Sequence, residues 1–478
     1  MANLKSLAKD TAIYGLSSIV GRFLNYLLVP LYTYYMPHDT GDYGISTNIY
    51  AYTALILVLL TFGMETTLFR FANDERYKSD TVFSTVMATV GSLTIVFLLL
   101  IFGFIGPISG ALGYSEHPDY LLMMAVVVAL DALQAIPFSY LRFQKRAIRF
   151  ASLKLLFIAL NLIYFVVLGK TSVFYVFFIN LLCTGFITLF FVPDLFKIHW
   201  KFDGQLLRTM LGYSWPILIL GIAGILNQVA DKIIFPLVYP DESQANVLLG
   251  DYGSCVKIAM IMAMITQAFR YAYEPIVFAK SKDADKTEYY ASAMKYFIIF
   301  TLLAFLCVVG WMPLLQYIIG ANYREGLGVV PIVMAAEIMM GIYFNLSFWY
   351  KLIDKTIYGA WFSLTGCLVL FAVNIIFIPQ YSYWACAWGG VAGYGTAMVL
   401  SYFVGQKKNP IPYPMKDIAI YVIATAVLFA VMKLLPASWP DILTLAVNTL
   451  LIILFTALIV KMDLPLSSLP IIGKKFKR

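Results

Sequence analysis

Charged side chains inside long apolar segments are the first residues of this sequence that could carry chemistry. Arg22, Lys232 and Lys257 each lie well inside a stretch that is otherwise apolar. A charge that faces lipid at the centre of a bilayer costs about 2.5–3.5 kcal/mol, so we expect each cation to face a water-filled cavity or a partner. Two alternatives stay open: the cations bind an anionic substrate, or they form structural ion pairs, for which Asp231 is the obvious neighbour of Lys232.

Acidic side chains occur in the same kind of segment. Asp131, Asp231 and Glu337 are predicted to lie at mid-membrane depth, where they either neutralise the cations or bind H⁺ or Na⁺ and couple transport to a gradient. The sequence does not decide between these two roles. Glu65 and Glu274 lie closer to one end of their apolar segments, so we expect them to form salt bridges with arginine and lysine side chains of the adjoining loops.

The sequence shows no catalytic or metal-binding constellation. The five cysteines have no Cys-x-x-Cys spacing, and three histidines are too few for a metal centre of ordinary type. Walker A, His-Glu-x-x-His and Ser/His/Asp arrangements are also missing. We therefore expect no enzyme, no cofactor and no metal. The net charge of +8 does not require a nucleic-acid partner, because basic loops that face anionic lipid headgroups account for it.

The segments that carry these charges occur in two copies. Gly41–Phe69 aligns without a gap with Gly250–Phe278; both begin with Gly-Asp-Tyr-Gly and carry a glutamate near the other end. The region around Asp131 aligns in the same way with the region around Glu337, at almost the same spacing. The chain is therefore an internal duplication with two homologous lobes. In a membrane chain, such repeats are typical of transporters whose substrate site lies between them.

Composition places the whole chain in a membrane. Of its 478 residues, 61% are apolar and 13% are charged, and apolar runs of membrane-spanning length recur from end to end. We predict an all-α polytopic membrane protein with 14 transmembrane helices. The expected spans are 10–36, 41–70, 79–110, 117–142, 147–169, 172–193, 207–238, 249–279, 288–318, 326–350, 356–379, 382–404, 416–435 and 440–461.

These spans divide into two homologous six-helix lobes and two C-terminal helices. The predicted divisions are an N-lobe at 1–195, a linker at 196–206, a C-lobe at 207–405, and a last helix pair with a basic tail at 406–478. Most of the 34 lysines and arginines fall in the loops of one side, which predicts that both termini are cytoplasmic. Lys295 lies near an inner helix end, where its amine is expected to extend to the interface.

Four stretches carry a resemblance to a known family. They are TAIYGLSSIVGRFLNYLLVPLYTYYM (11–36), GDYGISTNIY (41–50), GMETTLFRF (63–71) and GDYGSCVKIA (250–259). With the two lobes and the two trailing helices, they resemble the multidrug/oligosaccharidyl-lipid/polysaccharide exporter superfamily. Within it the chain is similar to the polysaccharide transporter branch, the Wzx-type O-antigen flippases.

The resemblance implies a cavity between the lobes that opens alternately to the two sides of the bacterial cytoplasmic membrane. The implied cargo is an undecaprenyl-diphosphate-type lipid carrying an oligosaccharide, which is flipped to the outer leaflet for O-antigen, capsule or exopolysaccharide synthesis. Arg22, Lys232 and Lys257 would be the cavity cations. The other implied partners are membrane lipids and H⁺ or Na⁺ as a coupling ion, and the protein is expected to be a monomer.

Other functions remain as alternatives. A lipid II flippase of the same superfamily is the nearest one. A multidrug/cation antiporter needs an acidic cavity, whereas the deep charges here are balanced or basic. A membrane polymerase or ligase is the least favoured, because the predicted outer loops are too short to fold into a catalytic domain.

Overall fold

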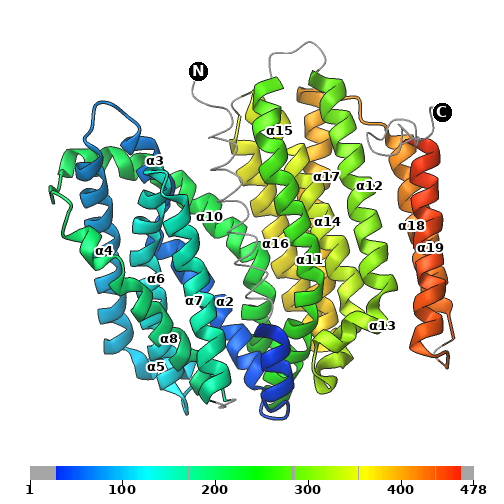
Figure 1. The fold of residues 1–478 in the computed structure, drawn as a ribbon, viewed down its shortest axis with the longest axis horizontal. Helices are drawn as coiled ribbons and strands as arrows, with labels where there is room; N and C mark the ends of the chain where they lie inside the picture. The colour runs from blue at the N-terminus through cyan, green and yellow to red at the C-terminus, as the bar shows by residue number, and fades with distance from the viewer. Residues whose placement is uncertain (1–27, 169–171, 281–285, 354, 437, 464–478) are drawn as a thin grey trace. The chain divides into compact units, whose positions relative to one another are not determined.

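The computed structural model describes residues 28–168, 172–280, 286–353, 355–436 and 438–463. Every regular element in these ranges is a helix (Figure 1). The chain forms two compact units. The first unit contains 1–253 and 367–389, and the second contains 254–366 and 390–478. The lobe boundaries expected from the repeat stay a prediction.

The described helices fall into two sets along the chain, divided between α10 and α11. The first set is α2 (Asp42–Thr61), α3 (Met64–Ala72), α4 (Ser79–Gly103), α5 (Ile105–Ala111), α6 (Pro118–Phe143), α7 (Ala147–Leu168), α8 (Val173–Leu189), α9 (Val192–Leu195) and α10 (Gly204–Val238). The second set is α11 (Glu242–Lys280), α12 (Lys286–Gly310), α13 (Met312–Leu315), η1 (Gln316–Ile318), η2 (Ala321–Val329), α14 (Val330–Leu346), α15 (Phe348–Leu352), α16 (Ile357–Tyr381) and α17 (Tyr383–Lys408), followed by α18 (Met415–Leu434) and α19 (Asp441–Met462).

Twelve helices of the described ranges are long and apolar enough to cross a membrane. They account for twelve of the predicted spans. The expected span 382–404 corresponds to α17, which is 26 residues long but is not among the twelve. Of the expected span 10–36, only 28–36 lies in the described ranges, and 28–35 is helical. The count of 14 and the cytoplasmic placement of the termini stay predictions.

Apolar side chains on the helix surfaces fit a lipid environment. On α4, Ile95, Leu99 and Phe102 are 60%, 67% and 54% exposed. Such a continuous apolar face is costly in water but is expected where a helix borders lipid. The opposite face of α4 packs on α6, which also contacts α8 in the first unit (Figure 1). Helix α4 therefore buries one stripe of its surface in the unit and leaves the other stripe apolar.

The Gly-Asp-Tyr-Gly motif marks a close approach of two helices in the first unit. A Cβ atom on Gly44 would lie 1.7 Å from the backbone oxygen of Asn246, at the start of α11. A Cβ atom on Gly253, the counterpart of Gly44, would lie 2.9 Å from the Thr47 side chain of α2. The last glycine of each copy thus allows the other copy to approach, since glycine has no side chain to keep the backbones apart.

The aspartate of the motif anchors neighbouring chain segments in both copies. Asp42 accepts hydrogen bonds from the Thr40 hydroxyl at 2.5 Å and from the backbone N–H of Val173 at 3.2 Å. Asp251 is nearly fully buried and lies 2.9 Å from Nε2 of His38. The duplicated motif is therefore a packing and anchoring device of the first unit.

One predicted helix is broken. The span expected at 41–70 is divided into α2 and α3 by two consecutive left-handed residues, Phe62 (φ 51°, ψ 29°) and Gly63 (φ 67°, ψ 11°). The expectation of one continuous helix was wrong there. Its counterpart α11 runs without a break through the equivalent positions. Glycine enters the left-handed region freely, whereas for a residue with a Cβ this conformation costs about 1–2 kcal/mol.

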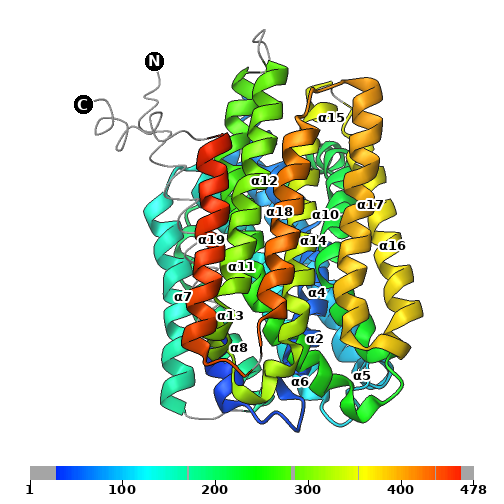
Figure 2. The ribbon, with the colours of Figure 1, turned by 90° about the vertical axis from the view of Figure 1, so that its right-hand side faces the viewer.

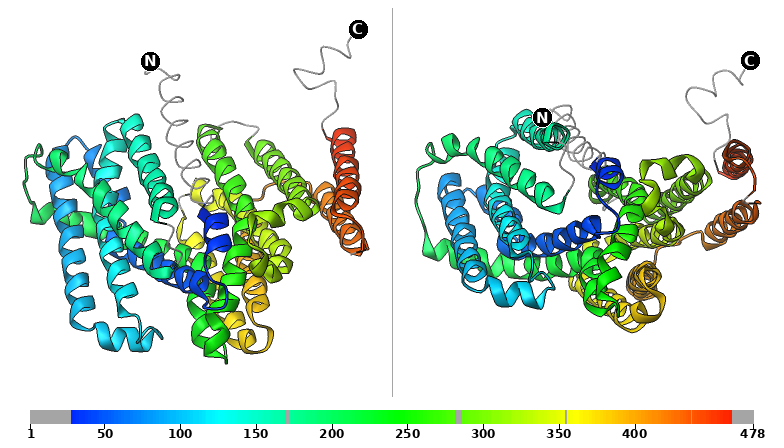
Figure 3. Two further views of the ribbon diagram at one scale, coloured as in Figure 1. Left: turned by 60° about the horizontal axis from the view of Figure 1, so that its bottom comes forward. Right: turned by 90° about the horizontal axis from the view of Figure 1, so that it is seen from below.

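An ion-paired cluster joins the last two helices to the rest of the second unit. Nζ of Lys295 on α12 lies 2.6 Å from Asp417 of α18 and also bonds Asp463, which follows α19. The Tyr421 hydroxyl donates to Asp463 at 2.6 Å. Two carboxylates from distant sequence positions hold the Lys295 amine, and its expected extension to the membrane interface stays a prediction. Figures 2 and 3 show α18 and α19, in orange and red, at the edge of this unit beside α12.

Candidate functional site

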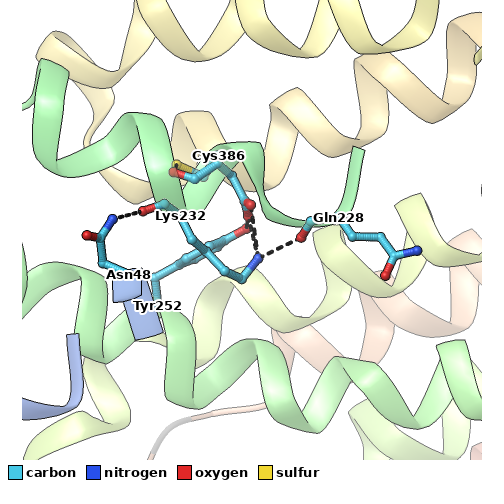
Figure 4. A network of polar contacts seen from close by, with 6 residues as sticks. Asn48, Gln228, Lys232, Tyr252 and Cys386 are labelled. Atoms are coloured by element: carbon cyan, nitrogen blue, oxygen red, sulfur yellow. Dashed lines mark hydrogen bonds and ion pairs between the residues drawn. The ribbon is translucent and has the colours of Figure 1, made fainter. Parts of the chain in front are cut away.

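Lys232 is locked in an ion pair rather than presented as a free cation. Its Nζ lies 2.9 Å from both carboxylate oxygens of Asp231 and 3.2 Å from the carbonyl oxygen of Gln228 (Figure 4). The Tyr252 hydroxyl donates to Asp231 at 2.6 Å, and the lysine amine also lies 5.6 Å from the centre of the Tyr252 ring. The structure thus contains the ion pair that the sequence left open for Lys232. The local charge is balanced within the first unit.

Asn48 extends this network to α2. Its amide donates to the backbone carbonyl of Lys232 at 2.7 Å, and its oxygen accepts from the Tyr114 hydroxyl at 2.7 Å. Asn48 is 2% exposed, so both bonds lie in the interior. The arrangement fixes the α10 backbone at the lysine, which limits how far the Asp231–Lys232 pair can move. In the duplication, the position of Asn48 corresponds to Lys257.

The other predicted cations are not brought together by the described residues. Arg22 lies outside them. Lys257 is half-buried in α11 and belongs to the second unit, whereas Lys232 belongs to the first. Glu337 is half-buried in α14 of the second unit. The convergence of these side chains on one chamber therefore stays a prediction.

Asp131 has an electrostatic partner in the first unit. It lies half-buried in α6 and attracts Lys154 of α7, whose amine lies 4.1 Å from the centre of the Phe138 ring. Lys154 also attracts Glu65 and repels Arg142. This placement fits a charge-balancing role for Asp131, one of the two roles left open by the sequence.

A pocket opens beside the break between α2 and α3. Its volume is about 380 Å³, and its lining residues are Thr61, Gly63, Glu65, Thr66, Phe69 and Arg142. Nη2 of Arg142 lies 3.5 Å from the Glu65 carboxylate, which confirms the expected salt bridge of Glu65. The Ser139 hydroxyl bridges the two, since it donates to Glu65 at 3.1 Å and accepts from Arg142 at 3.0 Å. The salt bridge expected for Glu274 falls on a side chain outside the described residues.

The charge and shape of this pocket follow from the break. Gly63 packs under α10, because a Cβ there would lie 3.0 Å from Ile217 and 3.2 Å from the Ser214 carbonyl oxygen. The break turns α3 so that Glu65 and Phe69 line the same space. The Arg142 guanidinium lies 5.1 Å from the centre of the Phe69 ring. With one arginine and one glutamate, the lining is neutral overall.

The second unit has a narrower space in the corresponding place, between α11 and the α14–α15 segment. Its volume is about 10 Å³, room for about one water molecule, and it is lined by Thr266, Phe269, Arg270, Tyr273, Phe297, Gly341, Phe344, Asn345, Phe348 and Lys351. Arg270 lies 4.6 Å from the centre of the Phe344 ring, and Lys351 lies 4.9 Å from that of Phe348. Among the described side chains that line this space, two are cations and none is acidic.

The three basic residues that line these two spaces were assigned to loops or helix ends by sequence reasoning. Arg142, Arg270 and Lys351 were counted as part of the basic side of the membrane, and none was singled out for a site. The signal that could have found them is the duplication itself, because each lies near the end of a duplicated segment. Among the described residues, no three His, Cys, Asp or Glu side chains are placed to hold a metal ion.

Comparisons with known proteins agree with this architecture. The model of a family described as polysaccharide biosynthesis protein matches residues 7–279. No curated protein sequence gives a significant match. Among solved structures, the lipid II flippase MurJ in an inward closed conformation is 14% identical with a TM-score of 0.74, covering 94% of this chain and 98% of its own.

Two multidrug transporters are also similar. An inward-facing MATE family transporter of the MOP superfamily is 12% identical with a TM-score of 0.67, covering 81% of this chain and 94% of its own. The MATE transporter DinF-BH is 16% identical with a TM-score of 0.60, covering 83% of this chain and 95% of its own. At such identities the likeness establishes the fold alone.

Proposed function

Because the chain belongs to the polysaccharide biosynthesis protein family, we propose that it is a flippase for a polyprenyl-diphosphate-linked oligosaccharide. The observation that supports this most is the combination of that family with the fold of multidrug and lipid-linked-substrate transporters. The cargo would move from the cytoplasmic to the outer leaflet by alternating access, for synthesis of O-antigen, capsule or exopolysaccharide. No covalent bond is made or broken.

Physical chemistry explains why such a cargo needs a protein. Its diphosphate is anionic and its sugars are polar, so neither part crosses the hydrocarbon core unaided. The cationic space of the second unit has the composition that a diphosphate requires. Arginine offers several N–H donors in a fixed fork, and lysine adds a point charge. Arg270 and Lys351 are therefore proposed as diphosphate-binding residues, which need the narrow space to open when the lipid enters.

The intramembrane charges predicted from sequence take proposed roles in this scheme. Arg22 and Lys257 are proposed as further cavity cations. Lys232 is a weaker candidate, because Asp231 already neutralises it. Asp231 and Asp131 are proposed to balance charge, and Glu337 to balance charge or to take part in coupling to H⁺ or Na⁺.

The setting of the protein is also part of the proposal. It would be a monomer in the bacterial cytoplasmic membrane with both termini on the inside. An N-lobe at 1–195 and a C-lobe at 207–405 would alternate around the lipid headgroup, while its polyprenyl tail stays in the bilayer. The remaining helix pair, α18 and α19, would move with the second unit because Lys295 ties both to α12.

A lipid II flippase is the second candidate, favoured by the likeness to MurJ over nearly the whole chain. Lipid II is also a polyprenyl-diphosphate glycan, so the same cationic space would serve it. The two candidates differ in phenotype: loss of a lipid II flippase stops wall synthesis, whereas loss of an oligosaccharide flippase removes a surface glycan.

The test is a leaflet-resolved assay of lipid-linked glycan in a deletion strain. The proposal expects the glycan lipid to accumulate in the cytoplasmic leaflet and to reach the outer leaflet again when the gene is restored. Unchanged surface polysaccharide, with no trapped lipid, would refute it. Trapped lipid II with normal surface glycan would favour the second candidate instead.

A further inference from the structure

The pocket of the first unit has properties unlike those of a diphosphate site. Its lining combines one cation with one anion, so it offers no net attraction to a doubly charged group. Its volume of about 380 Å³ lies within the range of about 300–1,000 Å³ typical of small-molecule pockets. A neutral, polar ligand with both donors and acceptors fits this lining better than an anion does.

Hydrogen-bonding capacity is left over on Arg142, one of the side chains that line the pocket. Nε–H of Arg142 is buried and has no hydrogen-bond partner in the part of the chain that the structure describes. Its Nη2 makes one contact with Glu65, at a length of 3.5 Å, and one with Ser139. An unpaired buried donor costs about 1–3 kcal/mol, so a shift of the Arg142 side chain that lets a ligand hydroxyl accept from this N–H is favoured.

The lining can both donate and accept, because Glu65 accepts only and Arg142 donates only. A sugar hydroxyl both donates and accepts, so neighbouring hydroxyls of one ring can bond to the carboxylate and to the guanidinium. The Phe69 ring lines the same space and offers an apolar surface to the C–H face of a sugar. Donor, acceptor and aromatic surface therefore meet in one pocket.

Backbone strain is concentrated at the same place. Phe62 is one of three non-glycine residues with a positive φ among the described residues, and it adjoins the pocket-lining Thr61 and Gly63. Such strain costs about 1–3 kcal/mol and typically persists at binding sites and switches. The unbroken helix α11 shows that the duplicated segment does not need the break to fold.

From these observations we propose that the pocket lined by Glu65, Phe69 and Arg142 is a glycan-binding subsite that takes an uncharged sugar ring of the cargo. The inference rests on the proposed flippase function. The two copies then divide recognition: the second unit binds the diphosphate through Arg270 and Lys351, and the first unit reads the sugar. The class of ligand is a neutral hexose or N-acetylhexosamine unit attached to the lipid diphosphate.

The test compares two lipids on the full-length protein in nanodiscs. One probe is undecaprenyl diphosphate without sugar, and the other is the lipid-linked glycan purified from the deletion strain. Glu65→Gln keeps the side-chain size but removes the acceptor charge. It is expected to weaken binding of the glycan lipid about tenfold, the cost of one charge-assisted hydrogen bond, and to leave binding of undecaprenyl diphosphate unchanged.

Two further variants keep the test decisive. Arg76→Gln removes a cation from an exposed ion pair with Asp74 on the same side of the unit, so it should change neither affinity. Phe69→Leu keeps the charge pair and removes the ring. It is expected to weaken binding of the glycan lipid and to leave binding of undecaprenyl diphosphate unchanged. This variant therefore tests the subsite if Glu65→Gln does not fold.

The outcomes separate the two levels of the proposal. The subsite is overturned if the pocket variants bind the glycan lipid as tightly as the wild type does. It is also overturned if folded variants lose the same amount of affinity for both lipids. A wild type that binds neither lipid overturns the proposed function instead. A selective loss for the glycan lipid supports both.

Discussion

The two copies of the duplicated helix begin alike and end differently. Both start with Gly-Asp-Tyr-Gly, and both use the last glycine of the motif for a close helix contact. At the other end, α2 and α3 are separated by a left-handed break beside a neutral pocket, whereas α11 continues unbroken beside a narrow cationic space. The shared start preserves the fold, and the divergent ends allow two different chemistries.

The difference has a simple origin in the sequence. Gly63 of the first copy corresponds to Ala272 of the second. Alanine is a strong helix former and carries a Cβ, whereas only glycine takes a left-handed conformation without steric cost. The break is therefore available to the first copy and disfavoured in the second. Four predictions test this comparison.

The largest effect is expected at the shared start. Gly44→Ala places a Cβ 1.7 Å from the backbone oxygen of Asn246, which cannot rotate away. We expect the free energy of unfolding to fall by about 3 kcal/mol or more, the upper end of the cost of overpacking. Little folded protein should then reach the membrane. Gly253→Ala meets only the Thr47 side chain, which can adjust, so its loss should be about 1 kcal/mol. Thermal unfolding of both purified variants measures the difference, and equal losses would contradict it.

Next in size is removal of the cations of the second unit. The double variant Arg270→Gln and Lys351→Gln should lower glycan-lipid flipping about a hundredfold, at about tenfold for each charge-assisted contact. The matched control is Lys407→Gln with Lys408→Gln, two exposed lysines at the end of α17, which should flip at the wild-type rate. Flipping in proteoliposomes at equal protein amounts is the measurement. If the double variant of Arg270 and Lys351 flips the glycan lipid at the wild-type rate, the proposal that the two copies bind different parts of the cargo is contradicted.

A smaller effect separates structural from substrate roles at Lys232. Lys232→Met leaves Asp231 unpaired, which we expect to destabilise the protein by about 2 kcal/mol, less than the ~3–5 kcal/mol for a fully buried pair. Adding Asp231→Asn should restore most of that stability, since no charge is then left alone. Flipping by the double variant is the second readout. If that variant is stable but inactive, the ion pair serves transport and not only structure.

The smallest effect tests the break itself. Gly63→Ala introduces a Cβ at φ 67° and should cost about 1–2 kcal/mol in melting experiments. Gly103→Ala, at the end of α4, meets no atom within 4 Å and should be neutral or slightly stabilising. An unchanged melting temperature for Gly63→Ala would mean that the break is not held by this glycine.

Sequence reasoning found what is periodic or repeated, and missed what depends on backbone detail or distant contacts. The duplication and the apolar spans follow from patterns within one segment. The salt bridge of Glu65 was expected from its depth, although its partner Arg142 was not. The pairing of Lys295 with Asp417 and Asp463 joins positions far apart in the chain, and no local pattern encodes it.

The break is the most instructive miss. Apolar periodicity runs through Phe62 and Gly63, so the pattern alone predicts one continuous helix. The single glycine was a weak signal, because glycine is tolerated in membrane helices. The outcome depends on the packing of α10 against Gly63, and the sequence predicted that helix but not its contact with Gly63.

The most direct test measures the flipping rates of glycosylated and bare undecaprenyl diphosphate in proteoliposomes and takes their ratio. The proteins compared are the wild type, Glu65→Gln, and the double variant of Arg270 and Lys351. We expect Glu65→Gln to lower the flipping rate of the glycosylated lipid only, and the double variant to lower the flipping rates of both lipids. A wild type that flips neither lipid, or a Glu65→Gln variant that flips both at wild-type rates, would contradict this expectation.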